Sequence, residues 1–109
     1  MSCIRNVFYP EAFQGKYIRT HWDFEGDLKD ILEKSGKKDD FWGKYKQRLQ
    51  FLEERKRDCI LRKNWFEKLK HVNDLYAVLF DKSQKNIRIL FSFIEYQGVE
   101  SAVLLYVFV

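Results

Sequence analysis

The stretch from Asn64 to Val109 limits the possible folds most, because it contains three apolar segments separated by polar turns. Alternating or continuous runs of β-branched and aromatic residues of this length are typical of strands. The expected strands are Leu75–Phe80, Ile87–Tyr96 and Ser101–Val109, with turns at Asp81–Asn86 and Gln97–Gly98. The last of them is apolar from Ala102 onward, which is typical of a strand buried on both faces. We therefore expect it in the middle of a small meander.

Helical patterns precede these strands. Asn64, followed three residues later by Glu67, is close to a capping box and predicts a short helix that ends near His71. Upstream, the patterns predict a strand at Ser2–Tyr9, a short helix at Asp27–Ser35 and a longer helix from Asp39 to about Arg57. Residues 11–26 follow no clear period.

The longer helix carries two stripes of side chains. An apolar stripe, which should pack on the sheet, consists of Phe41, Trp42, Tyr45, Leu49 and Leu52. A neighbouring basic stripe consists of Lys44, Arg48 and Arg55, with Phe51 beside it. We expect the helix to cross the sheet with these cations beside the contact.

Charge is unevenly distributed along a chain whose 109 residues suffice for one domain, 1–109. Residues 44–70 hold 10 basic and 4 acidic side chains, whereas the flanking regions are nearly neutral. Such a surplus attracts polyanions, nucleic acid above all, although it also suits a merely solvated helix face. Two cysteines are too few for a disulfide framework, and the longest apolar run is too short to span a membrane. A cytoplasmic location is therefore expected.

The side chains available for catalysis favour RNA cleavage without a metal or cofactor. The chain has no Gly-rich phosphate loop or zinc motif, and neither His21 nor His71 has a second ligand at metal-binding spacing. Cleavage by the 2′-hydroxyl needs a base, a proton donor and cations around the phosphate. Five residues could supply these groups if the fold gathers them: Lys68, Lys70, His71, Arg88 and Tyr106. Solvated helix lysines, a helix-capping histidine and a core tyrosine are the alternative interpretation.

Four segments resemble the RelE/ParE toxin superfamily, and most closely its HigB-like, phage-derived branch. The segments are Trp65–Lys70, Asp74–Tyr76, Ile87–Phe91 and Val103–Phe108. The resemblance covers roughly residues 41–109. It implies an α+β, microbial RNase-like β-α-α-β-β-β fold, in which two helices pack on a curved antiparallel sheet.

The same resemblance implies a toxin of a type II toxin–antitoxin pair that cleaves mRNA on the ribosome. Lys68 and Lys70 match the basic residues before the strands, Arg88 matches a strand arginine and Tyr106 matches the histidine or tyrosine of the last strand. His71 is included by proximity. Leu79 stands where the family usually has an arginine, so the site is either reduced or compensated by Lys85 and Arg62.

Three functions follow from these observations as alternatives. The first is a ribosome-dependent mRNA endoribonuclease, neutralised by a helix-turn-helix antitoxin that masks the basic groove. The second is a ParE-like protein that poisons DNA gyrase by binding, and the third is a catalytically silent domain that binds nucleic acid or antitoxin. The residues expected to contact RNA are Lys44, Arg48, Arg55, Arg62, Lys63 and Lys85.

Overall fold

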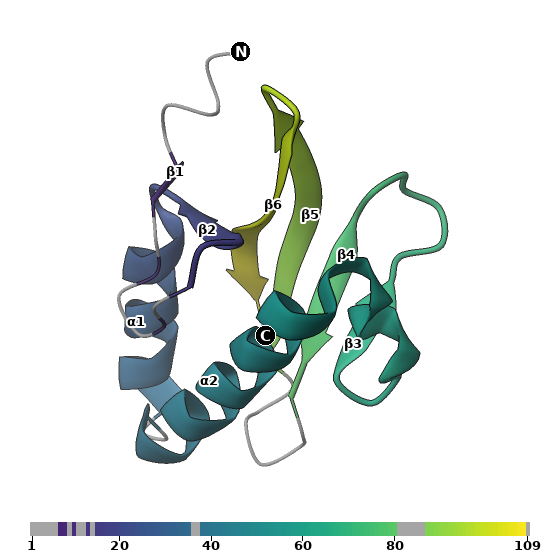
Figure 1. Ribbon diagram of the computed structural model, residues 1–109. Helices are drawn as coiled ribbons and strands as arrows, with labels where there is room; N and C mark the ends of the chain where they lie inside the picture. Colours follow the sequence, from purple (N-terminus) through teal and green to yellow (C-terminus); the bar gives the residue numbers. More distant parts are fainter. Residues whose placement is uncertain are drawn as a thin grey trace.

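A computed structural model describes residues 7–8, 10, 13, 15–35, 38–80 and 87–108. It is an α+β structure in which two helices cover one side of a mixed sheet (Figure 1). The helices are α1, Phe24–Ser35, and α2, Lys38–Arg55, which continues into the 3₁₀ helix η2, Lys56–Leu61. The strands are β1 Val7–Phe8, β2 Ile18–His21, β3 Phe66–Lys68, β4 Tyr76–Leu79, β5 Arg88–Tyr96 and β6 Val99–Phe108.

The strands lie in the order β1-β2-β6-β5-β4-β3, with the two-residue β1 at one edge. The expected three-strand meander is confirmed as β4, β5 and β6, and β3 extends it by one unexpected antiparallel strand. As expected, β6 lies inside the sheet, between β2 and β5. The ladder between β2 and β6 is parallel, so the sheet is not purely antiparallel. The connection from β2 to its parallel neighbour β6 is long, because it contains both helices, η2 and the strands β3 to β5. A parallel pair of strands requires a long connection of this kind.

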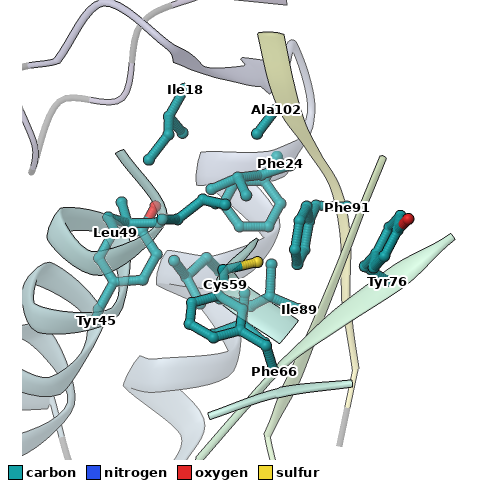
Figure 2. Packing of buried hydrophobic residues seen from close by; sticks show 14 of the residues in the cluster. Ile18, Phe24, Tyr45, Leu49, Cys59, Phe66, Tyr76, Ile89, Phe91 and Ala102 are labelled. Atoms are coloured by element: carbon teal, nitrogen blue, oxygen red, sulfur yellow. The ribbon is translucent and has the colours of Figure 1, made fainter. Parts of the chain in front are cut away.

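One hydrophobic core fills the space between helices and sheet. Side chains from α1, α2, η2 and the inner sheet face meet there, as Figure 2 shows for Phe24, Tyr45, Cys59, Phe66 and Ile89. The predicted apolar stripe of α2 is confirmed: Phe41, Tyr45, Leu49 and Leu52 are fully buried, and Trp42 packs against the cluster.

The predicted helix from Asn64 to His71 is wrong, because Phe66–Lys68 forms the edge strand β3. Backbone N–H groups of Trp65 and Phe66 donate to the carbonyl of Arg62, which closes a turn after η2. Phe66 is then buried against the core, and the backbone pairs with β4. Tertiary burial of one aromatic residue has outweighed a local capping signal.

Other element boundaries differ by smaller amounts. Residues 11–26, which follow no clear period, contain β2. The helix α1 begins at Phe24 rather than Asp27, with acidic side chains in its first turn. Such acids favour a helix N-terminus. The long helix ends as an α-helix at Arg55, because Lys56 adopts a positive φ of 54°. Of the strand expected at Ser2–Tyr9, the described residues include only Val7–Phe8.

The expected turns fall into two groups. Gln97 and Gly98 form the tight turn between β5 and β6, and their φ angles of 53° and 80° explain the glycine. The turn expected at Asp81–Asn86 lies outside the described residues, and so does Lys85.

Candidate active site on the open face of the sheet

The sheet face opposite the helices is defined by the strand register. Val78, Ile89 and Phe91 belong to the core, so the residues that alternate with them point to the other side. We call this side the open face. One row of paired residues crosses it from the edge strand to the middle of the sheet: Glu67, Ala77, Leu90 and Tyr106.

Glu67 and Arg88 form an ion pair on this face. The distance from Arg88 Nη1 to Glu67 Oε1 is 3.8 Å, and the two side chains are 45% and 43% exposed. Arg88 lies one row from Glu67 and pairs with Leu79 on one side and Phe108 on the other. At this exposure the pair contributes little to stability. Its groups are therefore available to a ligand.

Tyr106 lies at the other end of the same row. Its side chain is 63% exposed, and that of Phe108, two residues further along β6, is 43% exposed. A register shift between Leu90 and Phe91 leaves Leu105 without a partner and aligns Tyr106 with Leu90. Neighbouring strands are about 4.8 Å apart, so three spacings place the backbones of Tyr106 and Glu67 about 14 Å apart. Both side chains project from the open face, and Arg88 projects from the same face beside Glu67.

These three groups can perform acid–base chemistry on a phosphodiester. A carboxylate can accept the proton of a hydroxyl, a guanidinium can bind two phosphate oxygens, and a phenol can donate a proton.

The five residues predicted for catalysis do not gather at one place. Arg88 and Tyr106 share the open face. Lys68 alternates with Glu67 and pairs with Tyr76, whose ring is in the core, so it points to the helix side at the sheet edge. Lys70 and His71 are exposed in the turn after β3, where Leu69 N–H donates to the Leu75 carbonyl. This turn lies at the opposite end of the hairpin from Leu79, the partner of Arg88.

Sequence reasoning missed the position of Glu67 on the open face, because it read this residue as part of a helix start. If Phe66–Lys68 is read as a strand with Phe66 inward, alternation alone moves Glu67 outward and Lys68 inward. The signal was therefore present in Phe66, followed by the two charged residues Glu67 and Lys68.

Most of the predicted RNA-binding residues lie around α2 and η2, on the helix side. Arg48 is only 6% exposed, and its Nε donates to the Leu79 carbonyl at 2.8 Å. Its guanidinium lies over the rings of Trp65 and Phe80, so Arg48 is a structural cation rather than part of a solvated stripe. Arg55, Arg62 and Lys63 are exposed, and Lys44 is half-buried.

The remaining imidazole on the sheet is His21, at the end of β2. Thr20 pairs with Leu104 and is buried toward the helices, so Arg19 and His21 point to the open side. The Nδ1 atom of His21 is buried and has no hydrogen-bond partner among the described residues.

A polar cluster fixes the β5–β6 hairpin to the rest of the molecule. Arg57 Nε donates to Glu100 Oε1 at 2.7 Å, and the Tyr17 hydroxyl donates to the other carboxylate oxygen. Burial disfavours the Glu100 carboxylate, but the hydrogen bonds from Tyr17 and Arg57 outweigh it and lower the pKa of Glu100. Burial and the bond to Glu100 raise the pKa of Tyr17. This cluster joins the residue before β2 to η2 and β6.

Comparisons with protein-family models, curated proteins and solved structures find no match to this chain. Within the described residues, no helix is long and apolar enough to cross a membrane. The same part of the chain contains no group of three His, Cys, Asp or Glu side chains that could hold a metal ion. Any statement about function therefore depends on the site itself.

Proposed function

We propose that the protein is an endoribonuclease toxin of the RelE/ParE type, which cleaves mRNA on the ribosome with Glu67, Arg88 and Tyr106. The observation that supports this proposal best is the Glu67–Arg88 ion pair of 3.8 Å on the open face. The Glu67 carboxylate and the Arg88 guanidinium lie side by side and partly exposed. The phenol of Tyr106 lies in the same row of paired residues as Glu67.

The proposed reaction balances with these groups alone. Glu67 accepts the proton of the ribose 2′-hydroxyl, whose oxygen attacks the adjacent phosphorus. Arg88 binds the non-bridging oxygens as negative charge develops on them. Tyr106 gives its proton to the departing 5′-oxygen, so the products are a 2′,3′-cyclic phosphate and a 5′-hydroxyl. The proton on Glu67 then returns to the Tyr106 oxygen through solvent.

Induced expression in bacteria, followed by primer extension on cellular transcripts, tests this proposal. The unaltered protein should arrest growth and produce new 5′ ends, and Glu67→Gln should abolish both. The matched control is Glu95→Gln, which changes an exposed glutamate of β5 outside the site. Equal growth arrest and equal cleavage by Glu67→Gln would reject the proposed base. Growth arrest with intact mRNA and a DNA-damage response would favour gyrase poisoning instead.

One observation favours a second function, binding of RNA without cleavage. Leu79 pairs directly with Arg88, at the position where the resemblance implies another phosphate-binding cation. The cross-strand pair of Leu79 and Arg88 therefore has one arginine where the resemblance implies two cations. In that case Glu67→Gln changes nothing, and the unaltered protein binds RNA but produces no new 5′ ends.

A cytoplasmic antitoxin of the helix-turn-helix type is the partner that this proposal implies. Tyr106 and Phe108 expose apolar surface next to Arg88 on the open face. An acidic, amphipathic antitoxin segment would cover this surface and neutralise the guanidinium. Tyr106→Glu should weaken such a complex, and pull-down with the product of a neighbouring small gene would measure the effect.

A further inference from the structure

A shallow groove of about 600 Å³ runs along the outer side of α2, away from the open face. Its lining includes Lys46, Gln47, Gln50, Phe51, Arg62 and Trp65. The α2 residues recur every three or four positions and so form one stripe of the helix. The groove is therefore a continuous strip with polar groups along α2 and aromatic rings toward β3.

Aromatic rings and guanidinium groups alternate at this edge of the groove. The Arg62 guanidinium lies 3.4 Å from the centroid of the Trp65 ring and 5.5 Å from that of Phe51. On the Trp65 ring, the Arg48 guanidinium lies 4.6 Å from the centroid. Phe51 and Trp65 contact each other edge to face at 5.7 Å. The stack is rigid on the inside, where Arg48 is buried, and exposed at Arg62.

This chemistry fits unpaired nucleotides. Single-stranded bases stack on aromatic rings and on arginine planes, and amide side chains bond their edges. Here the exposed guanidinium of Arg62, which lies on the Trp65 ring, provides a flat surface, and Gln47 and Gln50 provide amides. Lys46 and Arg62 supply positive charge for the phosphates, against one carboxylate, Glu54, in the lining.

The groove also lies next to the proposed cleavage site along the chain. Trp65 is in the groove and Glu67 is on the open face, two residues apart at the edge of the sheet. Two residues of a strand span about 7 Å. Among the residues that the structure describes, β3 is the outermost strand at this edge of the sheet.

We infer that this groove binds the single-stranded RNA that flanks the scissile phosphate, with a base stacked on the exposed guanidinium of Arg62. The strand passes around the edge at β3 and reaches Glu67, Arg88 and Tyr106 on the other side. The choice of RNA rests on the proposed function, whereas the groove and its stacking groups do not. The groove increases affinity for the substrate and selects unpaired segments.

Fluorescence anisotropy with a labelled RNA of about 12 nucleotides, a usual length for single-strand sites, tests the inference. All proteins carry Glu67→Gln, so that cleavage does not deplete the probe. Arg62→Ala should raise the dissociation constant at least about fivefold, the lower limit for loss of one stacked base. Lys46→Glu should raise it by more than about twofold, because a carboxylate replaces a cation that faces the phosphates. The matched control Lys34→Glu reverses an exposed charge on α1, outside the groove, and should change it less than twofold.

An abasic RNA of the same length separates stacking from simple charge attraction. It should bind the unaltered groove at least about fivefold more weakly than the full RNA. Equal affinity for both probes, or equal losses in Lys46→Glu and Lys34→Glu, would overturn the inference. Tighter binding of an acidic peptide than of RNA, with competition between them, would assign the groove to a protein partner and also overturn it. Circular dichroism of each variant confirms that folding is unchanged.

The two proposals fail in different ways. If the groove variants weaken RNA binding while Glu67→Gln still cleaves, the groove stands and the catalytic assignment falls. If Glu67→Gln abolishes cleavage while the groove variants bind and cleave normally, the catalytic assignment stands and the groove inference falls.

Discussion

At the scale of single residues, the inward turn of Phe66 decides which charged side chain faces a substrate. It places Glu67 beside Arg88 and sends Lys68 to the helix side of the sheet edge. The proposed base is therefore a carboxylate beside a guanidinium, whereas the sequence predicted lysines at this site. Placing the base at Glu67 therefore makes a different prediction from placing it at Lys68, the next residue in the chain.

Tyr106→Phe should reduce the rate of RNA cleavage by about 10²- to 10⁴-fold, the usual range for loss of a positioned acid or base. Lys70→Ala and His71→Ala should leave that rate within about twofold, because both residues lie in the turn beyond β3. Single-turnover cleavage of an mRNA bound to ribosomes measures all three. A large loss in Lys70→Ala with none in Tyr106→Phe would move the site to the hairpin end.

Glu100 makes a pH-dependent contribution to stability. Its pKa is lower in the folded protein than the ordinary value of about 4.3, because Tyr17 and Arg57 donate to the ionised form. The ionised group therefore stabilises the fold above about pH 4.3, and the contribution disappears as the pH falls through the lowered pKa.

Urea unfolding of the unaltered protein and Glu100→Gln measures this contribution. The difference in free energy of unfolding should be constant near neutral pH and shrink below about pH 4.3. A difference that grows as the pH falls would contradict the hydrogen-bonded role of Glu100.

At the scale of elements, α2 contains a local weakness that substitution can remove. Gly43 lies inside the helix, and a Cβ added there would meet no atom within 4 Å. Gly43→Ala should raise the free energy of unfolding by about 0.5–1 kcal/mol, because alanine loses less backbone entropy in a helix. Gly98→Ala is the contrasting variant, and its φ of +80° should make it destabilising. Stabilisation by both variants in urea unfolding would contradict this account.

Sequence patterns predicted the elements whose burial follows a simple period. The apolar stripe from Phe41 to Leu52 and the continuous run after Ala102 correctly located α2 and the interior position of β6. Two short strands were missed, because β2 and β3 contain only four and three residues. Their conformation depends on partners far away in the chain, which local propensity does not register.

The candidate site was predicted only in part, again because the conformation of a short edge strand depends on partners far away in the chain. Arg88 and Tyr106 lie on long strands whose alternation could be read, and the structure places both on the open face. The register of the edge strand could not be read, so Glu67 was missed and the lysines were placed with the others. Arg48 was expected in a solvated stripe, but its contacts with Trp65 and Phe80 come from the fold.

At the scale of the whole molecule, RNA would contact positive charge on two sides of the sheet edge. The exposed cations concerned are Lys46, Arg55, Arg62, Lys63 and Arg88. Each phosphate that a cation neutralises on a single strand contributes about 0.7 to the slope of log affinity against log salt. Five contacts predict a slope of about −3.5, and Lys46→Glu should reduce its magnitude by at least about 0.7. Titrations at several salt concentrations measure the slope, and a slope near zero would exclude phosphate binding.

The position of β6 determines when the complete sheet can form during synthesis of the chain. This strand joins β2 to β5, although β2 lies early in the chain and β6 late. During translation, the two halves of the sheet must wait until Val99–Phe108 has left the exit tunnel. Long-range pairing of this kind slows folding and delays burial of the core. A nascent chain should therefore stay incompetent for activity until synthesis has passed this strand, which would protect the translating ribosome from its own product.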